Sequence, residues 1–223
     1  VRGREAVESI RAICDSAGKN VFIIAKIENE EGIENIDEII DSADGIMIAR
    51  GDLGVEIPAE EVPYLQKKII EKCNFKMKPV ITATQMLDSM MRNPRPTRAE
   101  AADVANAIYD GTDAVMLSGE SAAGKFPVES VNMMAKIAEE TEQHLSGHLL
   151  ERQRDIKSRV TISSTIAHMS VRAAEELEAS CIIAATMTGT TARYLSNFRP
   201  PCVIAGVTPN EWVMRRMQLY WGV

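Results

Sequence analysis

Four short apolar stretches in the first two thirds of the chain each end in polar or charged residues. Continuous apolar runs of this kind are typical of strands that are covered on both faces. Segments with helical periodicity separate them, and this alternation predicts a parallel sheet with right-handed crossovers. The predicted strands are Val21–Ile27, Gly45–Ala49, Pro79–Ala83 and Ala114–Leu117.

The helical segments have apolar residues at every third or fourth position. Thr97 and Glu100 have the spacing of a capping box at the start of one of them. Four strand–helix units fit either an open parallel sheet or half of a closed eight-stranded barrel. Both folds place their chemistry at the carboxyl ends of the strands, so the polar clusters mark the candidate site. The predicted helices are residues 4–17, 31–42, a segment beginning at Pro63, 97–109 and 127–145.

The pattern changes at residues 146–158, which are polar and poorly periodic and are predicted to be a linker. The predicted organisation is one α/β domain in residues 1–145 and a partial second one in residues 159–223. The chain does not begin with Met, and residues 219–223 resemble the start of another strand, so we expect a fragment cut at both ends. In the second domain we predict strands at 181–185 and 202–207 and helices at 160–177, 192–196 and 210–219.

Composition and charge narrow the possible functions. A net charge of −7 argues against a nucleic-acid-binding surface, although it is compatible with a local site for a small anion. No apolar run approaches the roughly 18 residues expected of a membrane span. None of the 4 cysteines forms a CxxC pair, and Cys14 and Cys181 are expected to be buried free thiols, as in a cytoplasmic protein.

Lys26 and Glu28 lie two residues apart on a predicted strand, so both side chains point to one face, and Asp52 follows the next strand. Two carboxylates at neighbouring strand ends suit Mg²⁺ or Mn²⁺, with positions left open for substrate oxygens. With Lys26 and one divalent ion the cluster has a net positive charge, which favours an anion such as a phosphate ester. A structural Lys–Glu pair at a strand end is the alternative.

Other polar groups follow the strands. The backbone N–H groups of Arg50–Gly54 suit a carboxylate, but the segment also fits an ordinary loop. Thr84 and Ser118 provide hydroxyls for a substrate or, alternatively, for a cap or a turn. In the second domain, the segment Thr186–Thr191 fits a phosphate cradle at a helix start or a capped turn. Neither a Walker A loop nor GxGxxG occurs.

Six segments, taken in order, resemble the pyruvate kinase family. The resemblance is dense over residues 21–145 and thinner over residues 160–223, which are similar to that family's C-terminal effector domain. It implies that residues 1–145 are the last four units of a parallel TIM-type (βα)₈ barrel, whose first units and lid domain lie outside this chain. The segments are Ala25–Asn29, Gly45–Gly54, Ala83–Leu87, Arg95–Glu100, Asp103–Asn106 and Met116–Glu120.

The resemblance also implies roles for single residues. Glu28 and Asp52 match the family's divalent-metal ligands, and the catalytic residues are Lys26, Thr84 and Ser118. Lys26 matches the group that stabilises the transferred phosphoryl, and Ser118 matches a hydroxyl implicated in protonating the enolate. The residues that match substrate-binding positions are Lys26, Ala49, Arg50, Gly51, Asp52 and Thr84. Those that match an effector phosphate loop are Thr186, Thr188, Gly189, Thr190 and Thr191, with Met187 where many members have Lys.

These roles imply phosphoryl transfer from phosphoenolpyruvate to ADP, giving pyruvate and ATP through enolpyruvate. Mg²⁺ or Mn²⁺ is the implied resident ion, and K⁺ is implied with ligands outside this chain. A sugar-phosphate effector, a homotetramer and a cytoplasmic location are further implications, with neither nucleic acid nor membrane as a partner. Two other hypotheses remain: a different Mg²⁺-dependent barrel that binds pyruvate or phosphoenolpyruvate, such as an aldolase or lyase, and a non-catalytic fragment. We expect the isolated chain to be inactive.

Overall fold

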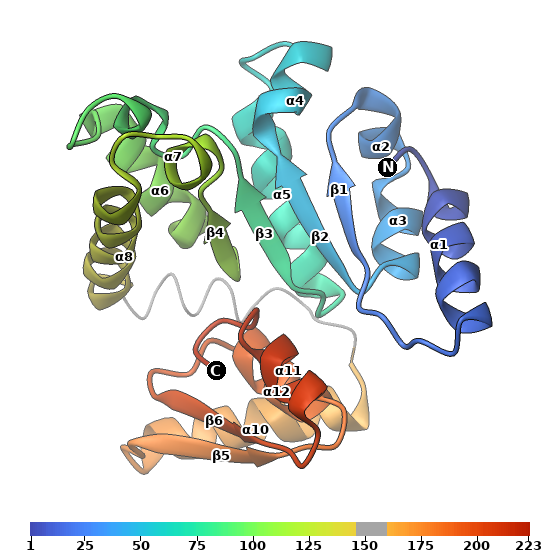
Figure 1. The fold of residues 1–223 in the computed structure, drawn as a ribbon. Helices are drawn as coiled ribbons and strands as arrows, with labels where there is room; N and C mark the ends of the chain where they lie inside the picture. Colours follow the sequence, from blue (N-terminus) through green and yellow to red (C-terminus); the bar gives the residue numbers. More distant parts are fainter. Residues whose placement is uncertain (146–159) are drawn as a thin grey trace.

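The computed structural model describes residues 1–145 and 160–223, and the predicted linker of residues 146–158 lies outside this described part. The first part is built on a four-stranded sheet in the order β1-β2-β3-β4, in which every neighbouring pair is parallel. Figure 1 shows these strands side by side, with helices connecting each strand to the next. The predicted parallel α/β architecture is therefore confirmed. The strands are β1 (Ile24–Ile27), β2 (Gly45–Ala49), β3 (Val80–Ala83) and β4 (Ala114–Met116).

Most helices of this part follow the predicted periodicity. The predicted capping box is present, because Thr97 Oγ1 accepts the Glu100 N–H and the Glu100 carboxylate accepts the Thr97 N–H. Within the described ranges, no helix has both the length and the apolarity needed to cross a bilayer. The helices are α1 (Arg4–Ser16), α2 (Glu30–Glu34), α3 (Ile36–Ser42), α4 (Arg50–Glu56), α5 (Val62–Phe75), α6 (Arg98–Asp110), α7 (Gly119–Ala122) and α8 (Pro127–Gln143), with the 3₁₀ turn η1 (Asp88–Met91).

Several features of this part differ from the sequence prediction, which includes neither α7 nor η1. The predicted helix over 31–42 is two helices that join at Asn35. The first strand begins at Ile24 rather than at Val21. Helix α4 is not predicted, because Gly51 and Gly54 have low helix propensity. Tertiary packing overrides that propensity, since Leu53 in α4 is fully buried.

The strand register decides which side chains meet the helices. Ala25 pairs with Ile46 and Ile46 with Val80, and these residues are buried in one cluster with Ile39 of α3 and Ile70 of α5. Side chains alternate along a strand. Lys26, which pairs with Met47, therefore points to the opposite face, away from these helices.

The second part packs three helices on two parallel strands, with Cys181 opposite Val203. Cys181 is exposed and Cys14 half-buried, so the prediction that both are buried thiols is wrong; Cys73 in α5 is the buried one. Cys181 is exposed because one face of this small sheet is uncovered, where Ile183 and Val203 are exposed too. Residues 219–223 form turns instead of the predicted strand start. The elements are α10 (Ile162–Glu176), β5 (Cys181–Ala185), α11 (Thr190–Asn197), β6 (Val203–Val207) and α12 (Glu211–Met217).

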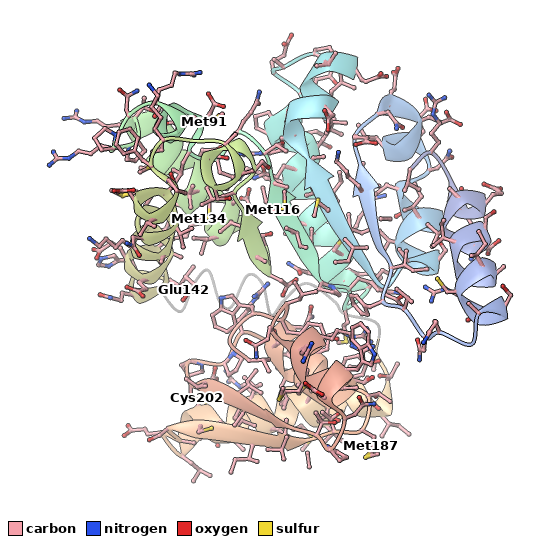
Figure 2. The ribbon with its side chains drawn as sticks, in the orientation of Figure 1. Met91, Met116, Met134, Glu142, Met187 and Cys202 are labelled. Carbon is pink, nitrogen blue, oxygen red and sulfur yellow. The ribbon has the colours of Figure 1, made fainter. Side chains whose placement is uncertain are left out.

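The two parts meet at the end of the large sheet where its strands begin (Figure 1). Arg199 of the second part is 3.2 Å from the carboxylate of Asp113, which directly precedes β4, and both side chains are buried. The Trp221 ring N–H donates to Glu142 Oε1 at 2.8 Å. Figure 2 shows Glu142 at the end of α8 that faces the second part. A buried ion pair and an aromatic hydrogen bond therefore join the parts.

Candidate active site

Lys26, Glu28 and Asp52 converge at the carboxyl ends of β1 and β2. Lys26 Nζ lies 2.7 Å from Glu28 Oε2 and donates to Asp52 Oδ2 at 2.9 Å. The hydrogen bonds to Glu28 and then to Asp52 raise the pKa of Lys26 above its ordinary value. The sequence predicts that these three side chains meet, and the structure brings them together in one partly exposed cluster.

The two carboxylates of this cluster fit a divalent cation. Both face one point, because a single ammonium group contacts an oxygen of each. Hard oxygen donors in this number suit Mg²⁺ or Mn²⁺, which bind through one or two carboxylates together with substrate oxygens. Within residues 1–145 and 160–223 no group of three or more acidic, histidine or cysteine side chains gathers as a complete metal site. Glu28 and Asp52 therefore fit an ion that shares its coordination with other ligands.

Gly51 and Thr84 bring the start of α4 against the end of β3. The Gly51 N–H donates to Thr84 Oγ1 at 2.7 Å, and Thr84 Oγ1 also lies 2.6 Å from the Ala83 carbonyl oxygen. A Cβ at Gly51 would lie 3.3 Å from Thr84 Oγ1, so the close approach favours glycine. Ala49, the last residue of β2, is fully buried just before this junction. These predicted substrate-binding residues thus lie together.

Arg50 is one of the predicted substrate-binding residues, and groups of the protein surround its side chain. Its side chain is buried and donates to the carbonyl oxygens of Thr84, at 2.9 Å, and Gln85, at 3.3 Å. It also donates to Asp103 Oδ1 at 2.7 Å and to Gln66 Oε1 at 3.2 Å. The guanidinium therefore holds the loop after β3, and direct substrate binding by Arg50 stays a prediction.

The loop after β3 has an uncommon backbone conformation. Thr84 and Gln85 have φ angles of 68° and 54°, in the left-handed region that non-glycine residues rarely adopt. Such residues cost of order 1–3 kcal/mol each and persist only when surrounding contacts hold them. The Arg50 guanidinium supplies these contacts from one side. Sequence reasoning missed this role, and the Arg50–Asp103 pairing has no local signal because 52 residues separate the two along the chain.

Ser118 follows β4, and its hydroxyl is buried with no hydrogen-bond partner in the described part of the chain. Two residues later, the buried Glu120 carboxylate accepts the Ser118 N–H at 2.9 Å and the Leu87 N–H at 3.0 Å. Figure 2 shows Met91 and Met116 near this region, at η1 and β4. Sequence reasoning did not assign Glu120, although an acidic residue just after a strand end was a usable signal.

The predicted effector loop in the second part forms a closed turn. Gly189 has a φ angle of 78°, and its N–H donates to Thr186 Oγ1 at 2.9 Å. Thr188 Oγ1 and Thr190 Oγ1 are 2.9 Å apart. The Arg216 guanidinium donates to the Thr188 carbonyl oxygen. These bonds fit the capped-turn alternative, and the phosphate site, which includes Thr191, stays a prediction.

Comparisons with known proteins agree with this arrangement. The family model "Pyruvate kinase, barrel domain" matches residues 1–131, and "Pyruvate kinase, alpha/beta domain" matches residues 164–223. The parallel sheet of residues 24–116 thus corresponds to part of a TIM-type barrel, and the second part to the α/β domain. The predicted fold class is confirmed at this level too.

Curated relatives match along the whole chain. A pyruvate kinase of Clostridium acetobutylicum is 55% identical in an alignment of 224 positions, which covers 100% of this chain and 47% of the relative. Those of Geobacillus stearothermophilus and Clostridium perfringens are 56% and 52% identical over 100% of the chain, which covers 38% and 48% of their lengths. The chain therefore spans less than half the length of these relatives. With the barrel model matching most of its residues, the chain belongs to the pyruvate kinase family.

Proposed function

We propose that the native polypeptide containing this chain transfers the phosphoryl group of phosphoenolpyruvate to ADP, giving pyruvate and ATP. The observation that carries the proposal is the convergence of Lys26, Glu28 and Asp52 at two strand ends in a member of this family. An ammonium group and two carboxylates can hold a divalent ion and a phosphoryl group side by side. The aldolase or lyase hypothesis is not favoured, because the matching relatives carry the name pyruvate kinase.

The residues have separate tasks in this reaction. Glu28 and Asp52 would hold Mg²⁺ or Mn²⁺, which when bound would supply positive charge for the anionic substrate. The Lys26 ammonium group places a second positive charge beside the transferred phosphoryl group. The loose transition state of phosphoryl transfer depends on such positioned cations. The backbone at Ala49, Gly51 and Asp52 and the hydroxyl of Thr84 hold the substrate carboxylate.

Atoms and electrons balance in two steps. The bond between phosphorus and the enol oxygen breaks as a bond forms to a terminal oxygen of ADP, and the electron pair stays on the enol oxygen. A proton is then added at the terminal methylene carbon, giving pyruvate. Ser118 belongs to the polar groups that deliver this proton, and its buried hydroxyl, without a partner in the described residues, is available for that task.

Five further features of the proposal rest on family resemblance. K⁺ is bound by residues outside this chain, and the enzyme works in the cytoplasm as a homotetramer. A sugar phosphate regulates it through Thr186–Thr191. The predicted division into residues 1–145 and 159–223 separates the catalytic part from the regulatory part.

The test is ATP formation from phosphoenolpyruvate and ADP by the native polypeptide. Lys26→Met removes the ammonium group, and we expect kcat to fall by about 10²- to 10³-fold while Mn²⁺ binding, measured by calorimetry, is retained. Lys68→Met is the matched control, because Lys68 is exposed on α5, pairs with Glu71 and lies over the Tyr64 ring of the same helix. Turnover by K26M within threefold of the control would remove Lys26 from this role.

The isolated 223-residue chain is proposed to be inactive and prone to aggregate. In the described part, β1 pairs only with β2 and β4 only with β3, so both outer strands present unpaired backbone groups. The relatives also have residues beyond the matched region that this chain lacks. Detectable ATP synthesis by the isolated chain would contradict this part of the proposal.

A further inference from the structure

We propose that Glu120 is a positioning residue for the protonation step, because its carboxylate fixes the loop that carries Ser118 to the loop that carries Thr84. The inference rests on the proposed function and goes beyond it, since it assigns a task to a side chain that faces neither the metal ligands nor Lys26. Three observations carry it: the burial of the carboxylate, the identity of its donors, and the loops to which those donors belong.

Glu120 is only 3% exposed. Glutamate is almost never buried to this extent unless it is paired, because burial removes the hydration of its charge. In the described residues no Lys, Arg or His forms an ion pair with it; its hydrogen bonds are to two backbone N–H groups. A buried carboxylate satisfied by backbone amides fixes those amides in place, because each bond to a charged acceptor is stronger than a neutral one.

The two amides belong to different loops. The Leu87 N–H donates to Glu120 Oε1 at 3.0 Å, and Leu87 ends the four-residue segment that begins at Thr84. The Ser118 N–H donates to Glu120 Oε2 at 2.9 Å. One side chain thus connects the loops that follow the neighbouring parallel strands β3 and β4.

The loop after β3 is held between two buried charges. Arg50 binds the carbonyl oxygens of Thr84 and Gln85, and Glu120 binds the N–H of Leu87. The left-handed backbone at Thr84 and Gln85 needs such support. Glu120 is the member of this pair that also reaches Ser118, so it sets the position of the Ser118 hydroxyl relative to Thr84.

Replacing Glu120 with Gln distinguishes a role in positioning the two loops from a role in packing alone. Glutamine has nearly the same shape, but one carboxylate oxygen becomes an NH₂ group, which donates and cannot accept a backbone N–H. One of the two bonds is therefore lost while the volume is kept. Because Ser118 serves the proton and Lys26 the phosphoryl group, E120Q should slow protonation more than phosphoryl transfer.

The experiment measures both steps on the native polypeptide. Phosphoryl transfer is followed as ATP formed from phosphoenolpyruvate and ADP. Proton delivery is followed by NMR as exchange of the pyruvate methyl hydrogens with D₂O in the presence of Mg²⁺, K⁺ and ATP. We expect E120Q to lower the exchange rate at least tenfold more than the rate of ATP formation, with the KM for phosphoenolpyruvate changed less than threefold.

Glu100→Gln is the matched control. The Glu100 carboxylate also accepts a backbone N–H, that of Ser89 at 2.7 Å, but it contacts neither Leu87 nor Ser118. We expect E100Q to leave the ratio of the two rates unchanged. Glu120→Asp, which is one methylene shorter and cannot span both amides, is made in parallel and should lower the ratio as E120Q does.

The outcomes separate the two proposals. If the wild-type protein catalyses neither reaction, the proposed function fails. If it catalyses both and a folded E120Q or E120D keeps the wild-type ratio within twofold, the inference about Glu120 is overturned while the function stands. Loss of folding in both variants would give Glu120 a purely structural role and would overturn the inference as well.

Discussion

Arg199→Met should destabilise the junction between the two described parts of the chain more than the loss of an exposed ion pair would. The Arg199 and Asp113 side chains are 4% and 9% exposed, and the guanidinium lies 3.2 Å from the carboxylate. The same guanidinium donates to the Gly111 carbonyl oxygen at 2.7 Å and lies over the Trp221 ring at 5.0 Å. Methionine keeps much of the aliphatic length but removes the charge and all the donors.

The expected loss of stability follows from the Asp113 carboxylate, which stays buried after Arg199 is replaced. Removing one partner of a buried ion pair costs about 3–5 kcal/mol, because the other charge stays buried without compensation. Burial already raises the pKa of Asp113, and the nearby Arg199 guanidinium lowers it. The Asp113 carboxylate keeps a hydrogen bond from the Val80 N–H at 2.9 Å. We therefore expect the lower end of that range, about 3 kcal/mol.

The assay uses the native polypeptide and the fluorescence of Trp221, which lies at the junction. Trp212 is 75% exposed and is replaced by Phe to leave Trp221 as the reporter within this chain. Urea unfolding followed at Trp221 gives the free energy of the junction. D113N and the double variant R199M/D113N complete a cycle, and the double variant should be less destabilised than the sum of the single ones.

Arg215→Met is the control, because Arg215 pairs with Glu211 on the surface of the same part. Exposed pairs contribute about 0–1 kcal/mol, so R215M should unfold close to the wild type. A loss of less than about 1 kcal/mol in R199M, or a coupling below about 0.5 kcal/mol in the cycle, would show that the buried pair does not hold the junction.

Three further predictions concern single side chains. R50K keeps a positive charge near Asp103 but lacks the guanidinium that binds the Thr84 and Gln85 carbonyl oxygens. We expect kcat/KM for phosphoenolpyruvate to fall by about 10- to 10²-fold with an unchanged circular dichroism spectrum. A normal kcat/KM would show that the loop keeps its conformation without Arg50. Burial alone would raise the pKa of Glu100, but hydrogen bonds from Ser89 and Thr97 outweigh it and hold the pKa below the ordinary 4.5. The ionised Glu100 carboxylate therefore stabilises the folded protein fully above pH 4.5, and this stabilisation is lost as the pH falls through the lower folded-state pKa. E100Q should differ from the wild type in Tm at pH 7, and the two Tm values should converge in acid. A difference in Tm that is the same at all pH values would refute this. Burial raises the pKa of the Cys73 thiol, so iodoacetamide should label Cys181 in the folded protein and Cys73 only after unfolding, as read by mass spectrometry.

Much of the fold is determined locally. Apolar runs such as Gly45–Ala49 and helical periodicity predict elements from neighbours in the chain, and the capping box at Thr97 needs only residues three apart. The carboxyl-end rule for parallel strands then places Lys26, Glu28 and Asp52 together without knowledge of the other contacts. The structure adds the contacts themselves, since Lys26 Nζ lies 2.7 Å from Glu28 Oε2 and 2.9 Å from Asp52 Oδ2.

Other features depend on contacts between residues far apart in the sequence. Propensity disfavours α4, yet burial of Leu53 stabilises it. The inward turn of Arg50 depends on Asp103, and the bridging role of Glu120 depends on Leu87, which lies 33 positions earlier. The sequence by itself therefore determined the order of the elements and the edge of the sheet that carries chemistry. Only the tertiary structure decided that the buried charges of Arg50 and Glu120 fix the loops at that edge. The reason is that a buried charge must be paired or hydrogen-bonded, and its partners here lie far away in the sequence.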